Sequence, residues 1–77
     1  MQRQPLLRWV LRHGQDALTC QVSATSPHAY QVSVVPHWNQ DSAVSQQFES
    51  ANDAVRRHAE IVGILRERGW RGTEYAR

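Results

Sequence analysis

One amphipathic helix with both a start and a stop signal constrains this chain more than any other feature. Ser50, with Asp53 three residues later, forms an acidic variant of the capping box that begins a helix. Gly69 followed by Trp70 fits a left-handed helix end that an apolar contact closes. A helix with one apolar stripe needs a second layer to cover that stripe. The residues that precede Ser50 must supply this layer.

The apolar stripe of the helix contains one unexpected residue. At about 100° per residue, six side chains share one arc and form the predicted core face: Ala51, Ala54, Val55, His58, Val62 and Leu65. His58 lies in the middle of this arc, and we interpret it as a neutral imidazole that is hydrogen-bonded to the sheet. The alternative is a pH-sensitive contact or a polar group that faces a cavity. Gly63 costs about 1 kcal/mol relative to alanine, which a close backbone approach would explain.

Two segments in the first half of the chain alternate with a period of two, as strands do. They are residues 17–25 and 29–35, and the turn 26–28 between them contains a proline. The residues predicted to face inward are Leu18, Cys20, Val22, Ala24, Tyr30, Val32 and Val34. A shorter alternation over residues 44–48 predicts another strand that leads into the helix. The chain therefore contains a hairpin and one further strand before the helix.

The N-terminal segment fits two structures. Pro5, an apolar side and a stop at Gly14 fit a short helix. The alternation of Leu7, Trp9 and Leu11, followed by a turn-like stretch, fits the arm of a second hairpin equally well. We favour the strand, because a two-stranded sheet would be too small to bury the helix.

These elements predict an α+β fold: a small antiparallel β-meander of three to four strands packed against one long C-terminal α-helix. Residues 1–70 form this single domain, and residues 71–77 lie beyond the helix stop as a flexible tail. The sheet face that does not carry the helix is expected to stay open to solvent. Trp9 and Trp70 are assigned to the core.

The chain is short, so its core is small. Seventy-seven residues bury only about 60–65% of the surface that the unfolded chain exposes. The single cysteine, Cys20, lies on the predicted apolar face, where it acts as a small hydrophobic side chain. Arg8 and Arg12 interrupt the apolar N-terminal segment before a signal-peptide run develops. We expect a cytoplasmic protein that does not bind a membrane.

No arrangement of residues in the sequence indicates a catalytic, metal-binding or cofactor-binding site. Closely spaced Cys or His pairs, a Gly-x-Ser-x-Gly elbow and a phosphate-binding glycine loop are all missing from the sequence. We therefore predict no catalytic residue, no cofactor, no metal site and no enzymatic activity.

The basic balance of the chain is modest. The net charge is +2 at pH 7 and the isoelectric point is about 9.3, with nine arginines and no lysine. The helix arginines alternate with acidic residues such as Glu60 and Glu67, so no dense cationic stripe results. The outward positions of the predicted strands also lack the aromatic side chains on which bases stack. Nucleic-acid binding through arginines of the C-terminal helix is therefore the alternative function.

An apolar residue on the wrong side of the helix points to a protein partner instead. Ile64 lies almost opposite the core arc, with Ile61 on its flank and arginines around them. A tryptophan in the loop 36–42 is a second contact candidate. The predicted contact residues are Trp38, Arg57, Ile61, Ile64 and Arg68. We predict a non-enzymatic protein-interaction module that binds a protein partner or a second copy of itself.

Overall fold

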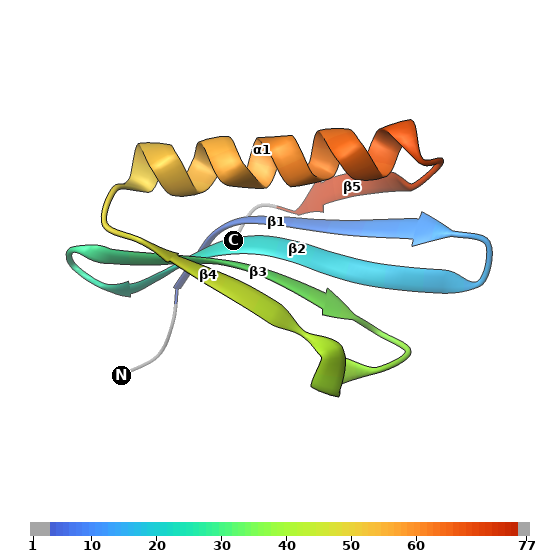
Figure 1. The fold of residues 1–77 in the computed structure, drawn as a ribbon, viewed down its shortest axis with the longest axis horizontal. Helices are drawn as coiled ribbons and strands as arrows, with labels where there is room; N and C mark the ends of the chain where they lie inside the picture. The colour runs from blue at the N-terminus through green and yellow to red at the C-terminus, as the bar shows by residue number, and fades with distance from the viewer. Residues whose placement is uncertain (1–3, 76–77) are drawn as a thin grey trace.

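The fold is one antiparallel five-stranded sheet with one helix on one face (Figure 1). The computed structural model describes residues 4–75 and the side chains of residues 6–72. The elements are β1 (Gln4–His13), β2 (Asp16–Ser26), β3 (Ala29–Pro36), the 3₁₀ helix η1 (Gln40–Ser42), β4 (Val44–Phe48), α1 (Ala51–Glu67) and β5 (Arg71–Tyr75). The predicted α+β class is confirmed, with one strand more than expected.

The extra strand comes from the segment that the sequence analysis predicted as a tail. The strand order is β4-β3-β2-β1-β5, so β1 to β4 form the predicted meander and β5 joins its far edge. β5 pairs antiparallel with β1, from Arg12 opposite Arg71 to Arg8 opposite Tyr75. The tail prediction is therefore wrong for residues 71–75, because β1 offered an unpaired edge. Residues 76–77 lie outside the described part of the chain.

The N-terminal segment is a strand, as we favoured. β1 pairs with β2 so that Trp9 lies opposite Cys20 and Leu11 opposite Leu18. The turn between the two strands contains Gly14, whose φ of 62° lies in the left-handed region that glycine adopts easily. The odd-numbered apolar residues of β1 consequently face the helix side of the sheet.

The core between the sheet and α1 consists of two neighbouring clusters. The first is formed by Leu11, Leu18, Cys20 and Val62, and the second by Val22, Val32 and Ala54. Ile61 packs against both clusters from the helix. Trp9 and Trp70 pack against the first cluster, as predicted. The period-two phases of β1, β2 and β3 therefore identified correctly the face that packs against the helix.

Both predicted signals set the ends of α1. The Ser50 hydroxyl accepts a hydrogen bond from the backbone N–H of Asp53 at 3.4 Å. At the other end, Gly69 has a φ of 97°, and its N–H donates to the carbonyl of Arg66 at 3.1 Å. The N–H of Trp70 donates to the carbonyl of Leu65 at 3.0 Å, which completes a Schellman motif.

One residue of the predicted core arc is exposed to solvent. Ala54, His58 and Val62 are buried, but the Val55 side chain is 42% exposed. The helix lies over β2, β3 and β4, whereas Val55 points to the β1 side, where a groove remains open. The helical period gave the direction of Val55 correctly but not the extent of the sheet beneath it.

The two glycines at positions 63 and 69 should respond in opposite ways to the same substitution. We expect Gly69→Ala to destabilise the fold by about 1–2 kcal/mol, because alanine resists a positive φ. A Cβ there would also lie 3.2 Å from the ring of His13. Gly63→Ala should stabilise the fold by about 1 kcal/mol, because its Cβ meets no atom within 4 Å. Urea denaturation of both variants measures these changes, and equal signs would contradict the assignment.

Candidate functional site

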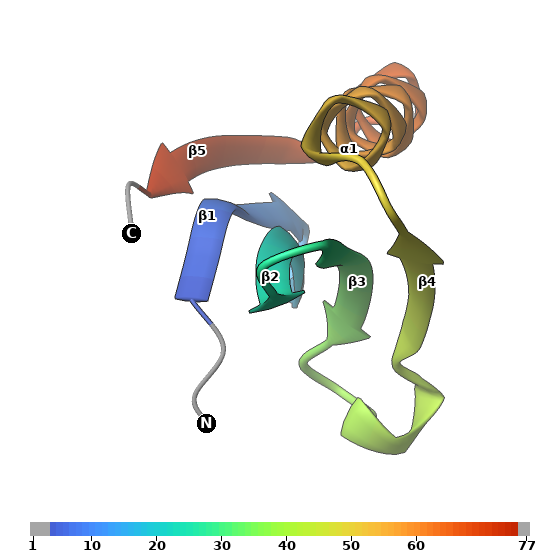
Figure 2. The ribbon, with the colours of Figure 1, turned by 90° about the vertical axis from the view of Figure 1, so that its left-hand side faces the viewer.

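The helix is narrower than the sheet it covers, which leaves apolar surface on both of its sides. An α-helix with its side chains is about 10–12 Å wide. Five strands spaced about 4.8 Å apart span roughly 19 Å between the outer two. Figure 2 looks along the helix and shows β4 on one side of it and β5 on the other. The β4 flank and the β1 flank of α1 are therefore the two candidate sites.

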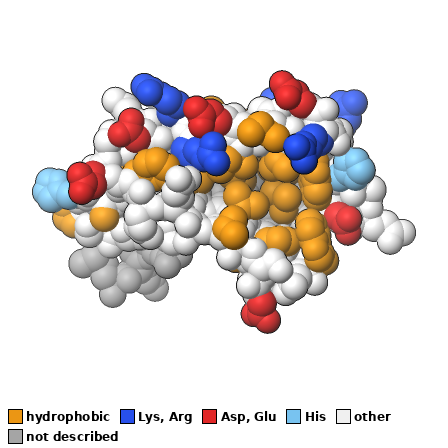
Figure 3. Space-filling model, viewed as in Figure 1, with side chains coloured by type: hydrophobic (Ala, Val, Ile, Leu, Met, Phe, Trp, Pro, Cys, Tyr) orange, Lys and Arg blue, Asp and Glu red, His pale blue; other side chains and the backbone are white. Residues whose placement is uncertain are grey.

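On the β4 flank, the strand and the helix diverge. They are joined by the short connection at residues 49–50 and separate toward the C-terminal end of α1 (Figure 1). Hydrophobic side chains gather in this gap beneath the C-terminal half of the helix (Figure 3). We call this region the wedge surface and define it by the apolar residues that border the gap: Val34, Trp38, Val44, Ile61, Ile64, Leu65 and Trp70.

The exposed members of the wedge surface are large. Trp38 is 57% exposed, Val44 64% and Ile64 48%. Val44 pairs with Val34 and lies two residues from Gln46, the β4 residue that contacts the helix. Val44 was predicted as a strand residue but not as a contact residue. Its position at the start of an edge strand was the sequence signal that could have identified it.

Four of the five predicted contact residues lie on the side of α1 that faces β4. Arg57, Ile61, Ile64 and Arg68 fall within about 60° around the helix, at 100° per residue. Arg57 fixes the direction of this stripe, because its Nε donates to the Oε1 of Gln46 in β4 at 3.2 Å. Ile61 is half-buried against the core, so only part of its side chain is available for contact with a partner.

Trp38, the fifth predicted contact residue, joins the wedge surface from the loop between β3 and β4. Its ring stacks on the ring of Trp70 with the centroids 6.2 Å apart. The loop next to it is tied to β2, since the N–H of His37 donates to the carbonyl of Ala17 at 2.9 Å. The His37 ring also hydrogen-bonds the Thr19 hydroxyl at 2.8 Å. Trp38 is thus held in place while most of its side chain stays exposed.

β4 forms one edge of the sheet and carries no charged residue. Its sequence is Val-Ser-Gln-Gln-Phe, and every residue except Phe48 is exposed. Natural edge strands usually carry lysine, proline or a bulge that prevents pairing with another chain. β4 contains no lysine and no proline, and it pairs with β3 in a register without a bulge. Its outer backbone groups are therefore available to another strand.

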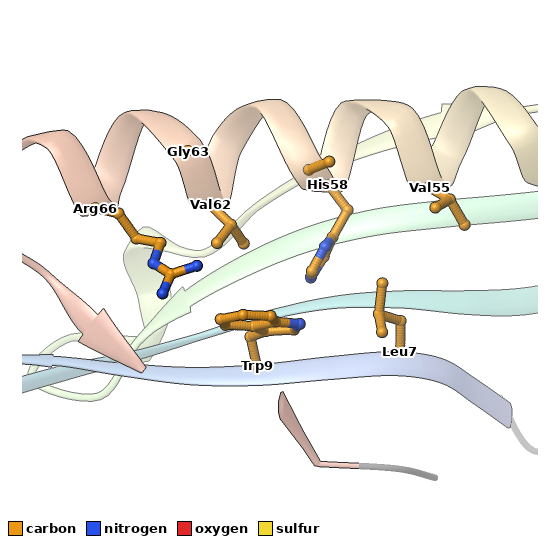
Figure 4. Close-up of a pocket in the computed structure, with 8 residues that line it drawn as sticks. Leu7, Trp9, Val55, His58, Val62, Gly63 and Arg66 are labelled. Atoms are coloured by element: carbon orange, nitrogen blue, oxygen red, sulfur yellow. The ribbon is translucent and has the colours of Figure 1, made fainter. Parts of the chain in front are cut away.

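On the β1 flank, a groove of about 380 Å³ separates α1 from β1 (Figure 4). Val55, Val62 and Arg66 reach down from the helix, and Leu7 and Trp9 rise toward them from β1. The other lining residues are His58, Ala59 and Gly63. The guanidinium carbon of Arg66 lies 5.5 Å from the centre of the Trp9 ring, a cation–π contact. The groove is apolar with one cation at one end.

His58 lies at the bottom of this groove and is hydrogen-bonded to the sheet, as predicted, while it also lines a cavity, as the alternative interpretation had it. Its side chain is only 2% exposed, and Nε2 lies 3.1 Å from the carbonyl oxygen of Cys20. Because a carbonyl only accepts, Nε2 carries the proton and donates. This bond links the middle of the helix to the middle of β2.

Gly63 does not have the role suggested for it within the fold. A Cβ at this position would meet no atom of the chain within 4 Å. No other backbone therefore approaches Gly63 closely. Gly63 and Ala59, which lies one turn earlier, instead leave space on the helix side of the groove, because they have almost no side chain.

The sheet face opposite the helix, which we call the outer face, is less open than predicted. Ser23, Gln31 and Ser33 are buried there, with exposed fractions of 1%, 7% and 8%. Gln31 lies opposite Ser23 and Ser33 opposite Gln21 on the neighbouring strands β2 and β3. Within β2, the Nε2 of Gln21 donates to the Ser23 hydroxyl at 3.3 Å. The Oε1 of Gln31 is buried without a hydrogen-bond partner in the described part of the chain. The prediction of an open face is wrong for this central region.

The arginines do not form one surface. Arg57 points to the β4 flank, where its Nη1 also pairs with Glu60 at 3.2 Å, and Arg66 points to the β1 flank. Arg12 and Arg71 lie directly opposite each other on β1 and β5, and Arg8 shares their face of β1. These three place positive charge at one side of the outer face, away from the two flanks.

Within residues 4–75, no three His, Cys, Asp or Glu side chains lie close enough together to hold a metal ion. The same residues include no helix with the length and apolar character needed to cross a bilayer.

Comparisons with protein-family models, curated proteins and solved structures found no match. The two flanks offer apolar contact area and few polar groups, as binding surfaces do.

Cys20 should behave as a buried hydrophobic residue. Its side chain is fully buried, and this burial raises the pKa of the thiol from 9.0 to about 12. We expect the native thiol to resist a disulfide reagent at pH 8 and to react once urea unfolds the chain. Because the unfolded thiol ionises first, its contribution to stability should be lost as the pH rises from 9 to 12. A Cys20→Ala variant should show a smaller decline, and a thiol that reacts readily in the folded protein would contradict this.

Proposed function

We propose that the protein is a non-enzymatic interaction module that binds protein through the wedge surface and the edge of β4. The observation that carries this proposal is the uncharged, exposed β4 edge next to a patch that includes Trp38, Val44 and Ile64. Exposed apolar patches beside free strand edges are typical of surfaces that another chain covers. Tryptophan is also enriched among residues that dominate binding energy.

The partner that fits this edge best is a second copy of the chain. Two β4 strands can pair antiparallel about a two-fold axis at Gln46, which makes the contact self-complementary. This register places Val44 opposite the Phe48 of the second copy, with both side chains on the helix side of the sheet. Such aromatic and β-branched cross-strand pairs contribute about 0.2–1 kcal/mol each. The dimer would contain one continuous ten-stranded sheet.

A charge at Val44 tests the proposal. Lysine on an edge strand opposes pairing, so Val44→Lys should shift the protein toward monomer in sedimentation velocity over a range of concentrations. Because the side chain is 64% exposed, the substitution should leave the folded state intact. Leu6→Lys is the matched control, since Leu6 is 49% exposed on β1, away from β4. A wild-type protein that stays monomeric at high concentration would rule out the second copy as partner.

Nucleic-acid binding is the second candidate, and the like-charged pair Arg12 and Arg71 is the observation that favours it. With Arg8 on the same face, about three phosphate contacts are available. The affinity for labelled single-stranded DNA should then fall by roughly 20-fold between 50 and 200 mM salt. Fluorescence anisotropy measures this, and Arg12→Gln should weaken the salt dependence. Affinity that does not respond to salt would exclude phosphate contacts as its source.

A further inference from the structure

The groove on the β1 flank has the dimensions of a small-molecule site and is separate from the wedge surface. Its volume of about 380 Å³ falls within the usual range for ligand pockets. Both walls are apolar: Val55 and Val62 stand on the helix side, and Leu7 and Trp9 on the β1 side. Ala59 and Gly63 leave space on the helix side, because they have almost no side chain. A ligand that fills this groove must therefore be apolar along most of its length.

The charge in the groove is confined to one end. Arg66 is the only charged residue among the lining side chains, and no described carboxylate pairs with it. Its guanidinium lies over the face of Trp9, with the carbon 5.5 Å from the ring centre. A guanidinium held over an aromatic ring still presents N–H groups at its edge, which bind carboxylates in a bidentate manner. The end of the groove at Arg66 is thus suited to a single anionic group.

The remaining polar group of the groove is already engaged by the fold. His58 Nε2 donates to the carbonyl of Cys20, and the side chain is almost fully buried. The groove therefore combines apolar walls with one cation and contains no acidic side chain among its lining residues. This combination disfavours cationic ligands and ligands with polar groups along their length.

We propose that the β1 groove binds a single-chain amphiphile with a terminal carboxylate, of the size of a medium-chain fatty acid. The carboxylate lies at Arg66, and the hydrocarbon chain extends between the helix and β1 toward Val55 and Leu7. Binding buries apolar surface on both walls and adds a charge-assisted contact at one end. The site is independent of the β4 edge, so a protein that does not self-associate can still bind this ligand.

A titration with decanoate, below its micelle concentration, tests the site. In ¹⁵N–¹H NMR spectra, decanoate should shift the resonances of residues that line the groove, such as Trp9, Val62 and Gly63. Decyltrimethylammonium, with the same chain and the opposite charge, should bind at least 10-fold more weakly. Shifts centred on the wedge surface, or equal affinity for both amphiphiles, would overturn the proposal.

Two substitutions test the contribution of the Arg66 charge to binding. Arg66→Gln should weaken decanoate binding about 10-fold and leave decyltrimethylammonium binding unchanged or stronger. Arg56→Gln, also on the exposed part of α1 but outside the groove, is the matched control and should have no effect. If both glutamine variants bind decanoate alike, the contact with Arg66 does not exist.

Gly63→Leu tests the proposed position of the hydrocarbon chain in the groove. Its Cβ has open space in the structure, so the leucine side chain should fill the groove without disturbing the core. Decanoate binding should fall at least 10-fold, while circular dichroism and urea denaturation confirm that the variant folds. The Val44→Lys variant should bind decanoate as the wild type does, which keeps this test separate from self-association. Wild-type affinity in Gly63→Leu would overturn the proposed position of the chain.

Discussion

A single helix has to cover one face of a five-stranded sheet, and the rest of the structure depends on that mismatch in width. α1 buries Ala54, His58 and Val62 against β2 and β3, where the two core clusters lie. It cannot also reach both edges of the sheet. Apolar residues that face the helix side therefore stay exposed on each flank. Both proposed binding sites are consequences of this incomplete layer.

The position of the helix decides what each flank contains. The capping bonds at Ser50 and Gly69 set its ends, and the hydrogen bond from His58 to the carbonyl of Cys20 fixes its rotation over β2. With this rotation, the stripe with Ile61 and Ile64 faces β4, and the stripe with Val55 faces β1. A buried polar contact of this kind gives orientation that apolar packing alone specifies less sharply.

Much of the fold could be predicted from the sequence, because local signals carry it. The two helix ends, the phases of β1 to β3 and the short strand before the helix all follow from caps, turns and periodicity. The contact candidates Arg57, Ile61, Ile64 and Arg68 do share one side of α1, because helical spacing is a local property. Their role in binding a partner stays a prediction. The groove could not be predicted, because it needs the distance between β1 and a helix about 50 residues later.

The sequence by itself determined α1, β2, β3 and β4 and the directions of their side chains, since these depend on neighbours along the chain. For residues 5–13 it favoured a strand without excluding a helix. Tertiary structure alone decided three further points. Residues 71–75 became a strand because β1 offered an edge, and Gly72 fits closely against Leu11 there. Val55 stayed exposed because the helix lies nearer to β4. Ser23 was buried in the middle of the sheet, where it lies opposite Gln31 of β3. Each of these depends on contacts between distant segments, whose geometry no local pattern encodes.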